Sequence, residues 1–339
     1  VTKGKVKVKN KYLFTNLDAF NATWTLKADD NVVQEGELGH LNIAPGETKE
    51  LTVPFDKPEL EPGVEYWLNI SFTLASATTW AKKGHEVAKE QFKVPFETPE
   101  SPALDLGEMP SIDVNDTDNE VNVTGENFEL SFDKEKGTID SFKHQGKELF
   151  KSGPMPDFWR APNDNDKGNG MPSRTGTWRH AGRDMKVDDV SVTPIGNKAV
   201  KLEVKASLPT TKASDYKVTY TVYGSGDVVV TSTLNPGKGL PEIPAVGMEM
   251  VIPEEFEQLT WYGRGPQENY WDRNTGADVG VYESTADEQF FPYVEPQETG
   301  NKTDVRWATL TNKQGDGLMV AGLPLVEVNA LHYSEDDLE

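Results

Sequence analysis

Polar and apolar residues alternate with a period of two in many short segments of this chain. Lys5-Val6-Lys7-Val8-Lys9 places lysines on one face and valines on the other, as in a half-buried β-strand. Similar segments follow at residues 24–28, 50–53, 66–74 and 85–94, with turn signals such as Ala44-Pro45-Gly46 between them. Regular short strands over residues 1–96 predict an immunoglobulin-like β-sandwich.

The composition changes over residues 97–119. Pro99, Pro102 and Pro110 stand among acidic residues, and apolar periodicity is weak. Proline and like charges both keep a chain extended and solvated. We therefore predict an acidic, proline-containing linker at 97–119.

Residues 120–339 again read as strands. Segments 217–222 and 228–234 flank GSGD at 224–227, and segments 307–311 and 318–321 flank KQGDG at 313–317. Both are hairpin signals. No segment shows helical periodicity for more than one or two turns, so the predicted fold class is all-β, with a large antiparallel sandwich as the second domain.

Charge and composition narrow the range of partners. The formal net charge of −22 argues against binding to nucleic acid or to anionic lipid. The chain has no run of about 18 apolar residues, which argues against a membrane-spanning helix. It has no cysteine, which excludes disulfides and thiolate chemistry. The first residue is Val1 rather than Met, so we expect a part of a longer protein.

Three stretches differ from ordinary strands because they combine proline, glycine, aromatic and charged residues. They are residues 158–168 (FWRAPNDNDKG), 261–273 (WYGRGPQENYWDR) and 292–300 (PYVEPQETG). Such loops need backbone conformations that glycine tolerates, and side-chain hydrogen bonds that hold their shape. Arginine and carboxylates within one loop predict ion pairs that fix it.

With these stretches the chain resembles the family-two β-galactosidases, in their small-chain, mutarotase-like domain. The 261–273 stretch is the most specific element of the resemblance. The first segment resembles the immunoglobulin-like domain that precedes the small chain, through residues 11–14 (KYLF) and 80–85 (WAKKGH). The resemblance implies domains at 1–96 and 120–339, and a parent enzyme that cleaves terminal β-galactosides, lactose among them, with retention.

Retaining glycosidases need two carboxylates about 5 Å apart. In the family these lie in a (β/α)₈ barrel whose signatures this sequence lacks, so no catalytic residue is predicted here and the chain alone is expected to be inactive. The resemblance implies as partners the enzyme's own barrel and amino-terminal domains, with the galactoside reached through the parent. It also implies Mg and Na ions and a homo-oligomer for the parent, but no cofactor for this chain.

By resemblance, an active-site loop lies beside the galactosyl site. Its residues here are Arg160, Asp164, Asn165, Asp166, Gly168, Asn169 and Gly170. Gly168 and Gly170 would be hinges, and residues 168–175 are expected to be mobile and poorly packed because apolar anchors are few. A plain turn is the alternative for these glycines. A solvated or arginine-paired turn is favoured over a cation site at Asp164 and Asp166.

The other candidate residues have structural or sugar-side roles. Trp261, Arg264, Glu268, Asn269, Asp272, Arg273 and Glu298 form this set. Trp159, Trp261, Tyr262 and Trp307 are expected in cores rather than on a sugar platform. The histidines at 40, 85, 144, 180 and 332 show no metal-ligand spacing and are predicted to be ordinary surface residues.

Several rival functions stay open. A self-standing sugar-binding module needs exposed aromatic residues, and a mutarotase needs an acid–base pair, for which Glu298 and His332 are candidates. A separately encoded small subunit would begin at the mutarotase-like domain, whereas this chain begins one domain earlier. The family carries a sugar-stacking Trp near its carboxy terminus that this sequence does not contain, so an incomplete last sandwich is expected. The compartment, cytoplasm or periplasm, is left open.

Overall fold

The computed structural model describes residues 1–39 and 41–339. Strands make up 46% of the chain and helices 6%, so the all-β prediction is confirmed. The chain divides into two compact units. Unit 1 holds Val1–Ala103, Tyr262–Pro266 and Asn274–Tyr282, and unit 2 holds Leu104–Trp261, Gln267–Arg273 and Glu283–Glu339.

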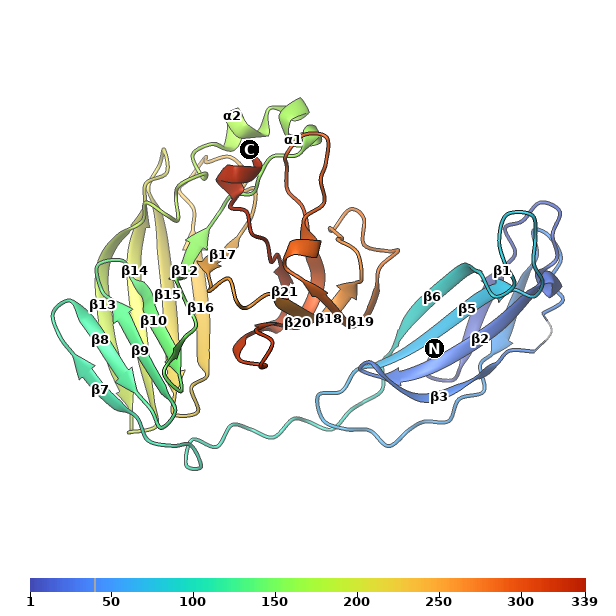
Figure 1. Cartoon of the computed structure of the whole chain (residues 1–339), viewed down its shortest axis with the longest axis horizontal. Helices are drawn as coiled ribbons and strands as arrows, with labels where there is room; N and C mark the ends of the chain where they lie inside the picture. Colours follow the sequence, from blue (N-terminus) through green and yellow to red (C-terminus); the bar gives the residue numbers. More distant parts are fainter. Residues whose placement is uncertain (40) are drawn as a thin grey trace. The chain divides into compact units, whose positions relative to one another are not determined.

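Unit 1 is built on two antiparallel sheets, of order β3-β2-β5-β6 and β1-β4 (Figure 1). Alternation buries one face of β2 and β5, where Leu26 and Leu68 are fully buried. A second apolar cluster surrounds Ile43, which is also fully buried. The elements are β1 (Lys5–Lys9), η1 (Leu17–Ala19), β2 (Phe20–Ala28), β3 (Asn31–Glu37), β4 (Thr48–Thr52), β5 (Tyr66–Leu74) and β6 (Glu86–Val94).

Two sheets of unit 2 enclose its main core. The sheet β11-β10-β9-β8-β7 faces the sheet β13-β14-β15-β16, and Phe132 of the first meets Tyr220 of the second with ring centroids 5.5 Å apart (Figure 1). The strands are β7 (Asp113–Asp116), β8 (Glu120–Thr124), β9 (Phe128–Asp133), β10 (Thr138–His144), β11 (Lys147–Glu148), β13 (Lys186–Ile195), β14 (Ala199–Leu208), β15 (Ser214–Tyr223) and β16 (Val228–Asn235).

The remaining elements carry the unusual stretches. Strands β12 and β17 pair with each other, and another sheet has the order β19-β18-β20-β21. These elements are β12 (Ser152–Asp157), α1 (Asp164–Asn169), α2 (Met171–Thr175), β17 (Gly247–Val251), β18 (Gln258–Gly265), β19 (Asp278–Thr285), η2 (Asp287–Gln289), β20 (Lys302–Thr311), β21 (Gly317–Val328) and η3 (Glu335–Leu338).

Both predicted hairpins form with tight registers. Val222 pairs with Val228 across the GSGD turn, and Thr311 pairs with Gly317 across the other. Local turn chemistry is sufficient to fix these connections, since each turn joins two segments of period two.

Two boundaries differ from the predicted ones. The predicted linker includes Asp113–Asp116, but these residues form β7, the edge strand beside β8. An edge strand faces water on most sides, so its polar sequence resembles a linker. Tyr262–Pro266 and Asn274–Tyr282 belong to unit 1 rather than to the second domain.

Specific contacts within unit 1 explain the second difference. The Trp67 indole donates to the Tyr262 hydroxyl at 3.1 Å. The Gln91 side chain exchanges two hydrogen bonds with the backbone of Val279, at 2.8 and 2.7 Å. Pairings across so great a separation in sequence leave no local signal.

Candidate functional site

The 158–168 stretch continues directly from β12. Phe158 and Trp159 are buried in the core of unit 2. The Arg160 guanidinium donates two hydrogen bonds to the Asp166 carboxylate, of 2.5 and 2.8 Å. The predicted arginine pairing is therefore confirmed for Asp166, whose side chain is only 9% exposed.

A capping box starts helix α1 and completes this arrangement. The Asn163 side chain accepts from the Asp166 N–H at 3.0 Å, and the Asp166 carboxylate accepts from the Asn163 N–H at 3.1 Å. The Asp166 carboxylate thus takes part in the cap of α1 and in the ion pair with Arg160. Sequence reasoning missed this helix, although an Asn followed three residues later by an acidic residue was a readable signal.

The segment after α1 is anchored, contrary to expectation. Met171 is 4% exposed and belongs to the main core, and Thr175 is fully buried. Arg174 donates to the Asn169 carbonyl at 2.9 Å and pairs with Glu242. The prediction of a poorly packed 168–175 loop is wrong because α2 turns Met171 and Thr175 inward.

The exposed residues of this segment nevertheless form one surface. Of the predicted loop residues, Asp166 is buried and Arg160 is half-buried. The others are exposed: Asp164, Asn165, Gly168, Asn169 and Gly170. Gly170 has φ 74°, which favours glycine at the junction between α1 and α2. Gly168 lacks this constraint, and a Cβ at that position would meet open space.

Glu268 is the centre of the second stretch. Its carboxylate accepts from Arg273 at 2.9 Å, from Thr299 Oγ1 at 3.2 Å, from the Gly300 N–H at 2.8 Å and from the Tyr293 hydroxyl. Burial opposes the ionised form, but these donors outweigh it and lower the pKa of Glu268. The Arg273–Glu268 ion pair is of the kind predicted to fix this loop.

Neighbours of Glu268 fix the same turn. Asn269 is 1% exposed and accepts from the Thr303 N–H at 2.9 Å and from the Thr303 hydroxyl at 2.6 Å.

Two other candidate residues of this stretch have different surroundings. Arg264 lies in unit 1, where it donates to the carbonyls of Asn274 and Ala277 at 3.3 and 2.8 Å. Asp272 is exposed.

The structure brings residues of all three stretches together within unit 2. The Glu298 N–H donates to the Ala161 carbonyl at 3.2 Å, which joins the third stretch to the first. The Gly300 N–H donates to Glu268, which joins the third to the second. The contacts between the three stretches join residues that are far apart in the sequence, so no local pattern predicts them.

Two titratable groups of this site are the half-buried Glu298 and the buried Lys302. Burial, with the nearby charges of Asp157 and Glu268, raises the pKa of Glu298 to about 7 against the weaker effects of Asn329 and Arg160. Burial lowers the pKa of Lys302 to about 8, although Glu268 opposes this. Lys302 was missed by sequence reasoning; its ammonium donates to the Gly300 carbonyl at 2.8 Å and lies 5.2 Å from the centre of a Trp261 ring.

The aromatic residues proposed for cores are mostly there. Trp159, Trp261 and Tyr262 are no more than 4% exposed, and Trp307 is partly buried. These four residues therefore form no exposed sugar platform, although other aromatic side chains, such as Trp80 and Trp271, are exposed.

The histidines occupy the surface. His85, His144, His180 and His332 are exposed, as predicted, and His40 lies outside the described residues. His332 pairs with Glu257 at 2.9 Å, whereas the Glu298 carboxylate accepts from Asn329 at 2.6 Å. The acid–base pair considered for a mutarotase therefore does not form directly.

Among residues 1–39 and 41–339, no group of three or more potential metal ligands converges. None of the described helices is long and apolar enough to cross a membrane.

Known protein families account for nearly the whole sequence. The model of the β-galactosidase small chain matches residues 124–339, and the model of β-galactosidase domain 4 matches residues 6–95. The chain belongs to the β-galactosidase small-chain family. The resemblance inferred from the sequence is thus confirmed, and the three converging stretches all lie in the small-chain region.

Relatives named beta-galactosidase cover the chain from end to end. One from Priestia megaterium is 44% identical over 99% of this chain and 32% of its own length. Another, from Streptococcus thermophilus, is 33% identical over 100% of this chain and 32% of its own length. The chain therefore spans about a third of the length of these curated relatives.

The raised pKa of Glu298 predicts a pH-dependent effect of Glu298→Gln. The folded state favours the protonated carboxyl, so its stabilising effect is complete below the ordinary pKa of 4.5 and is lost as pH rises through about 7. In urea unfolding, Glu298→Gln should match the wild type at pH 5 and exceed it at pH 8 by on the order of 1–2 kcal/mol. Glu295→Gln, at an exposed position, is the control. An equal effect of Glu298→Gln at both pH values would contradict the assignment.

Proposed function

We propose that this chain is the non-catalytic carboxy-terminal part of a β-galactosidase that hydrolyses terminal β-galactosides of the lactose type with retention. The observation that supports this most strongly is the tandem match of the domain 4 and small-chain models, beside relatives about three times as long. In this proposal the chain supports the catalytic barrel and supplies a loop at the active site.

Retaining hydrolysis needs two carboxylates on either side of the scissile bond, about 5 Å apart. By resemblance these belong to a (β/α)₈ barrel. The described residues instead form antiparallel sheets with 6% helix. Two carboxylates of the site have structural partners, since Asp166 caps α1 and pairs with Arg160, and Glu268 accepts from four donors.

The active-site surface in the proposal is the exposed side of α1. Arg160 and Asp166 hold the start of α1, and Met171 and Thr175 anchor the following helix, α2. The side chains of Asp164 and Asn165 are exposed, and in the proposal they face a galactoside or the barrel. The loop is therefore proposed to work as a firm edge of the site, with movement confined to the Gly168–Gly170 junction.

The first test is hydrolysis by the chain alone. Purified chain should release no nitrophenol from nitrophenyl β-galactoside above a blank, because the two catalytic carboxylates are elsewhere. The intact Priestia megaterium relative is the positive control. Turnover that stays with the chain through a second purification would contradict the non-catalytic assignment.

A chimera allows the loop to be tested in a whole enzyme. In it, this chain replaces the aligned third of the Priestia megaterium relative. Gly168→Ala should leave the stability within about 1 kcal/mol, because the new methyl meets open space and alanine favours a helix. The kcat and KM for nitrophenyl β-galactoside should change together if this junction moves during the cycle. Ser225→Ala, in the exposed GSGD turn, is the control. Unchanged kinetics for Gly168→Ala would leave the loop a plain turn.

A further inference from the structure

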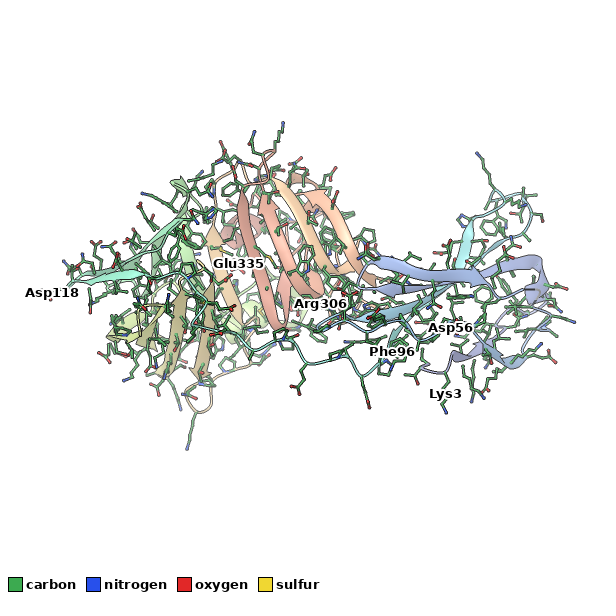
Figure 2. All side chains as sticks on the ribbon, turned by 90° about the horizontal axis from the view of Figure 1, so that it is seen from below. Lys3, Asp56, Phe96, Asp118, Arg306 and Glu335 are labelled. Carbon is green, nitrogen blue, oxygen red and sulfur yellow. The ribbon has the colours of Figure 1, made fainter. Side chains whose placement is uncertain are left out.

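Lys302 is the first residue of β20 and carries a positive charge into the interior of unit 2. The residue is only 3% exposed. In Figure 2, β20 is found by its labelled residue Arg306, among the strands of the sheet β19-β18-β20-β21. The Lys302 ammonium donates to the Gly300 carbonyl at 2.8 Å, its one hydrogen-bond acceptor in the described part of the chain, and lies 5.2 Å from the centre of a Trp261 ring. An ammonium has three donors, so this charge is buried with fewer partners than it has in water.

Gly300 binds an opposite charge on each side. Its N–H donates to the Glu268 carboxylate at 2.8 Å, and its carbonyl accepts from Lys302. Its φ of 81° is left-handed, which favours glycine. The preceding residue, Thr299, donates to the same Glu268 carboxylate at 3.2 Å. Together these bonds fix the point at which the 292–300 stretch enters β20.

The same stretch contacts the 158–168 loop at two points. The Glu295 carboxylate lies 3.5 Å from the Lys167 ammonium of α1, and the Glu298 N–H donates to the Ala161 carbonyl at 3.2 Å. Figure 1 shows the segment before β20 reaching α1. The position of Gly300 therefore affects the position of α1, because the intervening residues contact the helix and the chain before it.

The charge on Lys302 does not help the fold. Burial lowers the pKa of Lys302 to about 8, and the charge of Glu268 opposes this. The folded state thus disfavours the ammonium. The resulting loss of stability is complete below about pH 8 and disappears as pH rises from there to the ordinary lysine value of 10.5. An apolar side chain of similar length would avoid this loss.

We propose that Lys302 is a positioning residue for the active-site edge: its ammonium binds the Gly300 carbonyl, and the 292–300 stretch transmits that position to α1. The inference rests on the proposed function, in which α1 borders the site of galactoside hydrolysis. Lys302 acts through the stretch and not on the substrate. A buried charge that lowers stability and supports activity is an instance of the trade-off between the two.

Amide hydrogen exchange of the chain alone tests the transmission to α1. Lys302→Met removes the charge and the donor and keeps a similar length. The amides of Glu298 and Lys167, which donate to the Ala161 and Asn163 carbonyls, should exchange on the order of tenfold faster than in the wild type. The amides of the buried strands β14 and β15 should exchange at the wild-type rate and are the internal reference.

Urea unfolding of the chain alone tests whether Lys302 lowers stability. At pH 7 the midpoint of Lys302→Met should equal or exceed that of the wild type. The difference should shrink as pH rises past about 8, because the wild type then sheds the buried proton. Lys313→Met, in an exposed turn, is the control and should unfold like the wild type at every pH.

The chimera described above tests the consequence for activity. In it, Lys302→Met should lower kcat/KM for nitrophenyl β-galactoside by roughly ten- to a hundredfold, the size of effect that a small misplacement produces. Lys302→Arg keeps a charged donor and should recover most of this loss, and Lys313→Met should have no effect. A residue with only a structural role would lose stability and activity together, whereas Lys302→Met should lose activity alone.

Three results would overturn the inference. They are unchanged exchange of the Glu298 and Lys167 amides in Lys302→Met, a clearly lower urea midpoint of Lys302→Met at pH 7, and unchanged kcat/KM of Lys302→Met in an active chimera. An unsubstituted chimera without activity would instead contradict the proposed function. The exchange measurement needs no glycosidase activity, so it still decides in that case whether Lys302 positions α1.

Discussion

Replacing Arg160 by alanine is expected to lower the free energy of unfolding of unit 2 by about 3 kcal/mol. The substitution leaves the 9% exposed Asp166 carboxylate without its charged partner. Breaking a buried ion pair from one side is far more costly than removing a surface pair, because the remaining charge cannot recover its hydration. The Asn163 N–H remains as a donor, so α1 should form but less stably.

Arg174→Ala is the matched control. Arg174 also binds a carboxylate, that of Glu242, but its own side chain is 43% exposed and that of its partner 59%. Its loss should lower the free energy of unfolding by less than about 1 kcal/mol. Urea unfolding followed by tryptophan fluorescence compares the two variants. Equal losses would mean that Asp166 is not held as a buried pair.

Trp178→Ala should destabilise unit 2 by about 3–5 kcal/mol. Trp178 is fully buried, its ring centroid is 5.9 Å from that of Phe158, and its indole donates to the Pro241 carbonyl at 3.2 Å. Trp178 follows α2 and belongs to the main core of unit 2, so its removal leaves a cavity there. The loss of unfolding free energy should therefore be large.

Trp271→Ala provides the comparison within the same residue type. Trp271 is 73% exposed and its indole contacts the exposed Glu327 side chain. Such a surface substitution should change the free energy of unfolding by less than about 0.5 kcal/mol. A small effect of Trp178→Ala, close to that of Trp271→Ala, would restore the picture of a loosely packed segment after Gly168.

The sequence predicted the features that local chemistry determines. The GSGD hairpin could be read because its turn residues and its flanking periodicity agree. The pairing of Asp166 with arginine was also predictable, since Arg160 lies only six residues earlier in the same stretch. The family was recognisable from residues 261–273.

Other features depend on tertiary contacts or on signals that were outweighed. Asn163 and Asp166 have the spacing of a capping box, but Gly168 and Gly170 favoured the prediction of a loop. Met171 was counted as a loop residue because one apolar side chain in a polar segment shows no periodicity. The buried Lys302 could not be predicted, since residue type alone places lysine on the surface.

The activity of the chimera tests most directly whether this chain completes a β-galactosidase. The protein in which this chain replaces the aligned third of the Priestia megaterium relative is compared with the same relative lacking that third. The account predicts that the chimera hydrolyses nitrophenyl β-galactoside within about tenfold of the intact relative, which corresponds to about 1.4 kcal/mol of transition-state stabilisation, and that the shortened protein shows no turnover. A folded chimera that is as inactive as the shortened protein would contradict it.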